Sequence, residues 1–505
     1  MVCAPICEFT SASKSLKYQC SKNVEDDSIV LHSEVTKERF VQDNCARWIM
    51  NDHIAEYLAS YGSSIRYEDL PPEVVYRAKI LLIDTLACAI GGYTGEPSKI
   101  ARRMACRITS SDMAASLFGS SHKSSPELAT FANGVMIRYL DFNDAYFSNE
   151  GGHPSDNFSA ILSCSDAVHA GGKEVIVATV LAYEVFCRLT DRYTITPQGF
   201  DHAITGVISA VTGASKILGL SQKQMVEAIN LAVAPNIALG QTRKGEVSMW
   251  KGCALANAGR NAVFAALLAK EGMTGPSPIF EGVAGFFKAV SGKFTLEEFG
   301  GNGRPYRIMD VTMKRYPCGA VAQTAIDAAI LLRAKLSGID EITEINVGTF
   351  KFGKTAMAND AEKWHPKTRE TADHSMPYVI AVALKYGSVE YGHFSEACLN
   401  DPEVLELMQK IKVEETEECN KLYPGSYANR VEIITGPGEK MSELVLYNRG
   451  HPKNPLAGDE IDKKFHSLVK EFLPSPKRKE VLSLIRNLEA VNDIGKMMDL
   501  LNMDR

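Results

Sequence analysis

Apolar residues recur at three- and four-residue intervals from Asp52 to about Lys293. This period is typical of helices that bury one face. Strand-like alternation is scarce in the same stretch, so the pattern predicts one large all-α region. Its helices are expected at His53–Tyr61, Pro72–Tyr93, Glu96–Thr109, Pro126–Leu140, Asp156–Ala170, Gly172–Thr190, Ile204–Leu218, Ser221–Ala234, Lys251–Glu271 and Pro278–Val290.

The pattern changes after a glycine-rich segment at 292–303. Tyr306–Lys314 and Ile342–Phe352 alternate apolar and polar residues with a period of two, which predicts strands. A hairpin is expected where Asn429–Thr435 and Glu443–Tyr447 flank the turn Gly436-Pro437-Gly438. Further helices are expected at Val321–Leu336, Asp459–Glu471 and Arg478–Leu488.

These elements predict a mainly α protein in three parts. A helical domain takes residues 49–304 and 451–505, because the helices after residue 450 are expected to pack back on the first region. Residues 305–450 form a smaller α+β domain. Residues 1–48 are an expected disordered leader. They lack the apolar run of a secretory signal and have no arginine before Arg39, so a mitochondrial presequence is not favoured.

Composition excludes several classes of partner. The 505 residues are 45% hydrophobic and 23% charged, with a formal net charge of −6, which is ordinary for a soluble globular chain. No basic patch dominates, so nucleic acid is not an expected partner. The best apolar run, Val175–Cys187, contains Tyr183 and Glu184 and is too short to span a membrane. No membrane association is therefore expected.

The metal-ligand residues are scattered along the chain. Twelve cysteines include no CxxC pair, and the eleven histidines include no HExxH spacing. Free thiols in a reducing compartment are expected, in the cytoplasm or, as the alternative, the mitochondrial matrix. These spacings give no local support for a zinc site or an iron–sulfur cluster, and no metal site is predicted.

The candidate chemistry centres on the stretch 138–157, RYLDFNDAYFSNEGGHPSDN. Asp141 ends a predicted helix, and His153 stands directly before Pro154, which favours the first turn of a helix. The positive end of a helix dipole disfavours an imidazolium, so His153 is expected to be a neutral general base. Asp141 lies twelve residues earlier and could accept a hydrogen bond from its ring. In the structural alternative, Asp141 only ends a helix and His153 only caps one.

Cations and further histidines also stand near predicted helix starts. Arg243, Lys244 and Lys251 form a plausible anion cradle, with a solvated loop as the alternative. Lys314 precedes another helix, in KRYP, and His202 begins a third. His374 is expected only as a cap. Neutral histidines, a carboxylate and several cations suit proton abstraction next to a carboxylate, on a substrate with two or three carboxylates.

Several segments resemble the MmgE/PrpD family, which includes 2-methylcitrate dehydratase and cis-aconitate decarboxylase. The segments are LLIDTLACAIGG (81–92), FANGVMIRYLDFNDAY (131–146), GGHPSDN (151–157), ASKILGLS (214–221), MKRYPCG (313–319), TADHSMPY (371–378) and GHPKNPLAGDEIDKKF (450–465). The resemblance covers about 52–490. It implies a large helical domain from both chain ends, an inserted lid domain, a homodimer and no cofactor.

The resemblance also assigns site residues by motif. It implies catalytic roles for Asp141, His153 and His202, and carboxylate binding by Lys251 and Lys314. Arg243 is added from its position in the cradle. The chain departs from the family after Pro317, where members often carry a histidine or an acid. It also lacks the Arg-Thr-Tyr-Arg-His run of bacterial 2-methylcitrate dehydratases.

Two features of the sequence bear on the reaction. GGHPSDN and the spacing from His202 to Leu218 resemble the dehydratases more than the decarboxylases. We therefore expect metal-independent dehydration of 2-methylcitrate or a longer 2-alkylcitrate. The alternatives are a cis-aconitate decarboxylase that makes itaconate and an inactive helical scaffold or binding protein.

Overall fold

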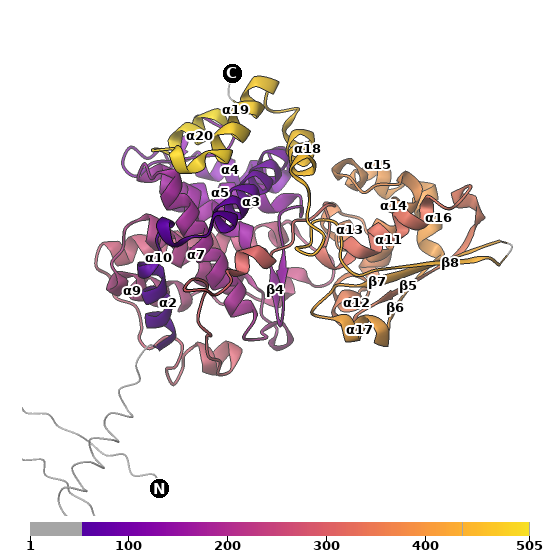
Figure 1. The fold of residues 1–505 in the computed structure, drawn as a ribbon, viewed down its shortest axis with the longest axis horizontal. Coiled ribbons are helices and arrows are strands. Elements are labelled where there is room, and N and C mark those ends of the chain that lie inside the picture. Colours follow the sequence, from indigo (N-terminus) through magenta and orange to yellow (C-terminus); the bar gives the residue numbers. More distant parts are fainter. Residues whose placement is uncertain (1–52, 437, 504–505) are drawn as a thin grey trace, which may run out of the picture. The chain divides into compact units, whose positions relative to one another are not determined.

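A computed structural model describes residues 53–436 and 438–503 (Figure 1). The predicted leader, residues 1–48, lies outside this range. The described part of the chain is mainly helical, with one four-stranded sheet and two short strand pairs. The first helices are α2 His53–Ser64, α3 Pro72–Gly91, α4 Glu96–Ala105, α5 Pro126–Tyr139, α6 Asn157–Ala167, α7 Gly172–Thr190, α8 Ala203–Ile217, α9 Gln222–Val233 and α10 Ala254–Lys270.

These helices confirm the predicted periodicity, and their ends follow local chemistry. Pro72 and Pro126 occupy the first turns of α3 and α5, where a missing N–H costs nothing. Ser221 caps α9 by accepting a hydrogen bond from the backbone N–H of Gln224 at 3.3 Å, and the Gln224 side chain accepts from the backbone N–H of Ser221. α7 is buried along almost its whole length. None of the helices in the described ranges is long and apolar enough to cross a bilayer.

The predicted helix at Pro278–Val290 is wrong. The segment turns at Gly282 and Gly285, whose backbone N–H groups donate to Pro278 O and Gly282 O. A Cβ at either glycine would lie 2.5 Å from a carbonyl oxygen, so these turns require glycine. Only one π-helical turn forms, at Phe287–Ser291.

The predicted strand at Tyr306–Lys314 is also wrong. Arg307–Asp310 forms a 3-10 turn, because the buried carboxylate of Glu184 accepts a hydrogen bond from the Arg307 N–H at 2.7 Å. Only Thr312 pairs, with Ala145. The alternation of apolar residues reflects burial of single side chains rather than strand pairing.

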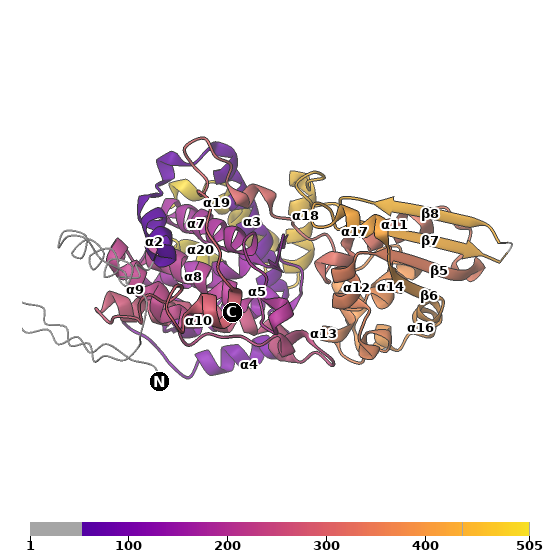
Figure 2. The ribbon, with the colours of Figure 1, turned by 90° about the horizontal axis from the view of Figure 1, so that it is seen from below.

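The sheet has the order β6-β5-β7-β8 (Figure 2). β5 pairs in parallel with β6 and antiparallel with β7, and the predicted hairpin is present as β7 and β8. The strands are β5 Ile342–Thr349, β6 Ile411–Glu415, β7 Asn429–Thr435 and β8 Lys440–Val445. The helices around them are α11 Gln323–Arg333, α12 Lys351–Met357, α13 Arg369–Ala372, α14 Met376–Tyr386, α15 Glu396–Leu399, α16 Pro402–Gln409 and α17 Glu417–Leu422.

The described residues form two large hydrophobic cores, and the chain passes from the first to the second near residue 315. One includes buried side chains from Ile54 to Met313 and again from Ile461 to Leu501. The other includes buried side chains from Tyr316 to Ile433 and contains the sheet. The last helices, α18 Gly458–Val469, α19 Ser475–Arg486 and α20 Gly495–Leu500, therefore return to the first core, where α18 and α19 pack on α3. The division into a helical domain and a lid stays a prediction.

Candidate active site

A cavity of about 460 Å³ is lined by residues that flank both cores. Its titratable lining comprises His153, His202, His374, Arg138, Arg243, Lys244, Lys314, Lys363, Asp141, Glu150 and Asp201. Apolar side chains complete the wall: Phe147, Phe200, Leu239, Val321, Phe352 and Met357. Of the predicted site residues, Asp141, His153, His202, Arg243 and Lys314 line this cavity. Lys251 does not line it, but its Nζ lies 3.3 Å from the Asp141 carboxylate.

Asp141 is the centre of the charged cluster. It follows α5 in a turn with φ of +50°, an uncommon conformation for a residue with a side chain. The buried carboxylate accepts hydrogen bonds from Arg138 and from Lys314 Nζ at 2.6 Å, and Lys251 Nζ lies 3.3 Å away. Burial alone would raise the pKa of Asp141, but Arg138, Lys314 and Lys251 hold it well below its usual range. The carboxylate is therefore ionised and fixed.

His153 occupies the N-cap position of the 3-10 turn Pro154–Asp156, as expected for a helix start, but its side chain makes no capping hydrogen bond. Its Nδ1 donates to Asp144 O at 2.7 Å, and its Nε2 accepts from Arg138 at 2.8 Å, because a guanidinium can only donate. Burial and the neighbouring Arg138 lower the pKa of His153 well below its usual value. The imidazole is neutral at pH 7. The expected hydrogen bond from this ring to Asp141 is wrong, because Arg138 lies between them and contacts both.

His202 faces His153, with 5.7 Å between ring centroids. It occupies the N-cap position of α8 without a capping hydrogen bond from its side chain, and its Nε2 accepts from Arg243 at 3.1 Å. Arg243 also binds Asp201, at 2.6 Å from Nε to Oδ2. Burial and the Arg243 charge lower the pKa of His202 to about 3. Two neutral imidazoles thus face one another across part of the cavity.

The two lysines predicted to bind carboxylates are buried beside acids. Lys314 Nζ donates to the backbone oxygen of Asp141 at 2.9 Å as well as to its carboxylate. Lys251 lies in a 3-10 turn, Met249–Gly252, just before α10 rather than in the helix itself. Its Nζ donates to Asp373 Oδ1 at 2.5 Å.

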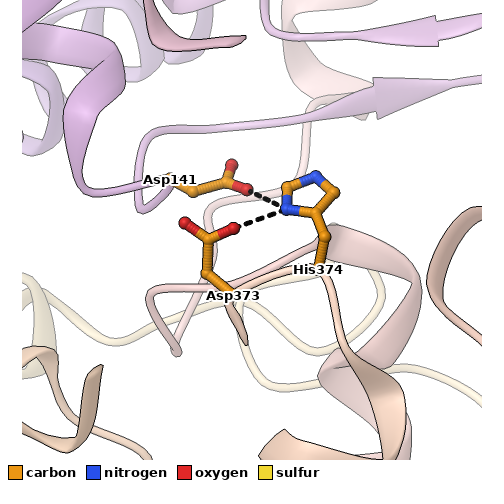
Figure 3. A group of neighbouring side chains, drawn as sticks. All are labelled: Asp141, Asp373 and His374. Atoms are coloured by element: carbon orange, nitrogen blue, oxygen red, sulfur yellow. Dashed lines mark hydrogen bonds and ion pairs between the residues drawn. The ribbon is translucent and has the colours of Figure 1, made fainter. Parts of the chain in front are cut away.

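The sequence interpretation missed Asp373 and the role of His374. His374 Nδ1 lies 2.6 Å from Asp373 Oδ1 and 3.2 Å from Asp141 Oδ2, so one ring nitrogen serves both acids (Figure 3). Its Nε2 has no hydrogen-bond partner among the described residues. Burial and Lys251 lower the pKa of His374 to about 4. The adjacent acid and histidine of TADHSMPY were the available signal. Arg138 could not be predicted as a site residue, because a single buried arginine produces no recognisable sequence pattern.

Three ligand atoms of Asp141, Asp373 and His374 lie within 4.8 Å of one another, a spacing that a metal ion could use. Arg138, Lys251 and Lys314 already contact these two carboxylates. Asp156 Oδ2 also lies 3.9 Å from Arg138 Nε. The positive charges beside Asp141 and Asp373 oppose the binding of a divalent cation there.

Comparisons with known proteins show which proteins this chain is similar to. The chain matches the MmgE/PrpD N-terminal domain over residues 56–298 and the MmgE/PrpD C-terminal domain over residues 316–490. It is 27% identical to a mitochondrial 2-methylcitrate dehydratase of Yarrowia lipolytica, over 88% of this chain and 89% of the relative. It is 28% identical to an alkylcitrate dehydratase of a fungal species, over 82% and 86%. It is 24% identical to human cis-aconitate decarboxylase, over 90% and 95%.

Proposed function

The chain belongs to the MmgE/PrpD family, and on that premise we propose that it dehydrates a citrate-type tricarboxylic acid, 2-methylcitrate or a longer 2-alkylcitrate. One observation carries the proposal: neutral histidines and buried cations line the same cavity. Proton abstraction next to a carboxylate needs a neutral base and fixed positive charge for the enolate that develops. Relatives named as 2-methylcitrate and alkylcitrate dehydratases support the choice of substrate.

The cations would hold the substrate carboxylates. Arg138 and Arg243 each donate one hydrogen bond to a histidine Nε2, and a carboxylate is a stronger acceptor for the same donors. Lys244 and Lys363 line the cavity as well. Substrate binding would draw the guanidinium groups away from the rings, and each freed Nε2 lone pair could then accept a proton.

The two facing imidazoles would share the proton transfers. One of His153 and His202 removes the proton from the carbon next to a carboxylate. The electron pair of that C–H bond forms the C=C bond, and the C–O bond breaks. The other imidazole takes a proton from solvent when the substrate carboxylates bind and gives it to the departing hydroxide, so that water leaves; the first imidazole then returns its proton to solvent. Lys314 and Lys251 would stabilise the negative charge on the enolised carboxylate. Asp141 would keep both ammonium groups in place.

The apolar part of the cavity lining would accommodate the alkyl substituent of the proposed substrate. Phe147, Val321, Phe352 and Met357 line the cavity together with the charged groups. A methyl or longer alkyl branch would be buried against them, at about 0.8 kcal/mol for each CH₂. The proposed substrate thus matches both the charged and the apolar parts of the lining.

We also propose that the reaction needs no metal, since lysine and arginine charges already neutralise the acids that could ligate one. Added chelator should therefore leave turnover intact.

Cis-aconitate decarboxylation is the second candidate. It is favoured by the human decarboxylase, which matches nearly the whole chain at similar identity. The same cations would bind cis-aconitate, and one histidine would protonate the carbon that loses CO₂.

Purified protein offered 2-methylcitrate, citrate and cis-aconitate separates these possibilities. Absorbance from a new conjugated double bond marks dehydration, and CO₂ release marks decarboxylation. Silence on all three acids would favour a scaffold and contradict the proposal.

Assembly and compartment complete the proposal. We expect a homodimer, because apolar side chains on α4 and around α10 are exposed, including Met104, Trp250 and Phe264. Size-exclusion chromatography with light scattering tests this.

The free thiols of buried Cys88 and Cys164 support a reducing compartment, the cytoplasm or the mitochondrial matrix.

A further inference from the structure

Three successive backbone carbonyls in the turn that carries Asp141 accept hydrogen bonds from cationic side chains. Leu140 O accepts from Arg369 at 3.1 Å, Asp141 O from Lys314 at 2.9 Å, and Phe142 O from Lys464 at 2.8 Å. The turn follows the end of α5, where carbonyls lack helical partners and cations are favoured. The three cations come from parts of the chain far apart in sequence.

Lys464 joins this turn to the backbone of Lys314. Its Nζ lies 2.8 Å from Phe142 O, 2.8 Å from Lys314 O and 2.7 Å from Asp84 Oδ1. Two of its N–H donors serve the two carbonyls, and Asp84 pairs with the ammonium by charge. The ammonium also lies 3.8 Å from the centre of the Phe142 ring. Lys464, in α18, thus connects the turn of Asp141 to the segment of Lys314, and the side chains of these two residues contact each other.

Arg369 joins the same turn to the segment of Asp373 and His374. It begins α13, and Asp373 N–H donates to Arg369 O at 2.9 Å. Its guanidinium lies against Tyr139 and Tyr391, at 4.9 and 4.6 Å from the ring centres. Arg369 therefore fixes the acid–histidine pair relative to Asp141.

We propose that Lys464, with Asp84, and Arg369 are positioning residues of the reaction: they clamp the turn of Asp141 against Lys314 and against His374. None of the three lines the cavity, so they act through the residues they hold. The inference rests on the proposed function. The clamp matters because Asp141 holds an uncommon backbone conformation and contacts four groups at once. A displacement of about 1 Å among such groups can cost about a hundredfold in rate.

The main test compares Lys464→Met, Lys464→Met with Asp84→Asn, and Lys463→Met. The double variant removes both charges and leaves no unpaired buried acid, so its melting temperature should recover toward wild type. Its kcat should nonetheless stay about a hundredfold low, with KM changed far less. Lys463 is the adjacent, exposed residue of α18 and pairs with Asp459 at the surface, so its variant should keep wild-type kinetics. A stable double variant with wild-type kcat would overturn the clamp.

Arg369→Met provides a second variant, with exposed Lys367→Met as its control. Hydrogen–deuterium exchange of the peptide 138–147 gives a readout that needs no activity. Exchange there should quicken in the double variant and in Arg369→Met, and stay unchanged in both controls. Unchanged exchange in the clamp variants would overturn the inference. If the wild-type protein turns over none of the three acids, the proposed function is contradicted but the clamp is not. The hydrogen–deuterium exchange comparison tests the clamp without any activity.

Discussion

Replacing Lys314 by methionine tests whether a buried ammonium is needed for turnover. Lys314 is fully buried, and its Nζ makes two hydrogen bonds to Asp141, at 2.6 and 2.9 Å. Methionine is a flexible apolar side chain of similar length. The substitution therefore removes one charge and two hydrogen bonds while it fills most of the volume.

The expected losses differ for folding and for catalysis. Arg138 and Lys251 still neutralise the Asp141 carboxylate, so the folding cost should be that of lost buried hydrogen bonds, about 1–3 kcal/mol. Removing one preorganised charge donor should lower kcat/KM on the order of a hundredfold. That loss corresponds to about 2.7 kcal/mol of transition-state stabilisation.

Steady-state kinetics on 2-methylcitrate, with thermal melting in parallel, measure both losses. The control is Arg315→Met, because Arg315 is the adjacent, exposed cation of the same segment. It should leave kcat/KM within the error of the assay. Near wild-type kinetics in Lys314→Met would refute the claim that its charge acts on the reacting carboxylate.

Three further predictions follow from the same site. His153→Gln should lower kcat by about two to four orders of magnitude with little change in melting temperature; a mere cap would cost at most about 1 kcal/mol of stability and leave turnover alone. Burial and, after it, the Arg243 charge lower the pKa of His202 to about 3, so Arg243→Met should raise this pKa while the effect of burial remains; histidine NMR titration checks this, and an unmoved midpoint would contradict it. Overnight dialysis against a strong chelator should leave the rate intact, and a loss restored by iron or magnesium would disprove metal independence.

The helices could be predicted from sequence because burial repeats along them. α7 has the predicted bounds, Gly172–Thr190. The errors arose where distant contacts decide the backbone. Glu184 holds Arg307 in a 3-10 turn, and nothing in the alternation around Tyr306 reveals that carboxylate. The strand Ile411–Glu415 was missed, because five residues give too short a pattern and its partner β5 lies far away in sequence.

The candidate site shows the same limit. Asp141 and His153 could be found because a helix end and a helix start stand close together in sequence. The link between these two residues could not be predicted, because it is made by Arg138, which contacts both. A buried arginine leaves no periodic signal in the sequence. Lys464 lies more than three hundred residues from the turn it holds. Only the folded chain shows which carbonyls its ammonium reaches.

The central claim is that this cation-lined cavity removes water, and not CO₂, from a citrate-type acid. The most direct measurement is carbon-13 NMR of 2-methylcitrate labelled in its carboxylates and incubated with metal-free protein. We predict the signals of an unsaturated acid that keeps all three labelled carboxylates. Labelled CO₂, or unchanged substrate beside a folded protein, would contradict it.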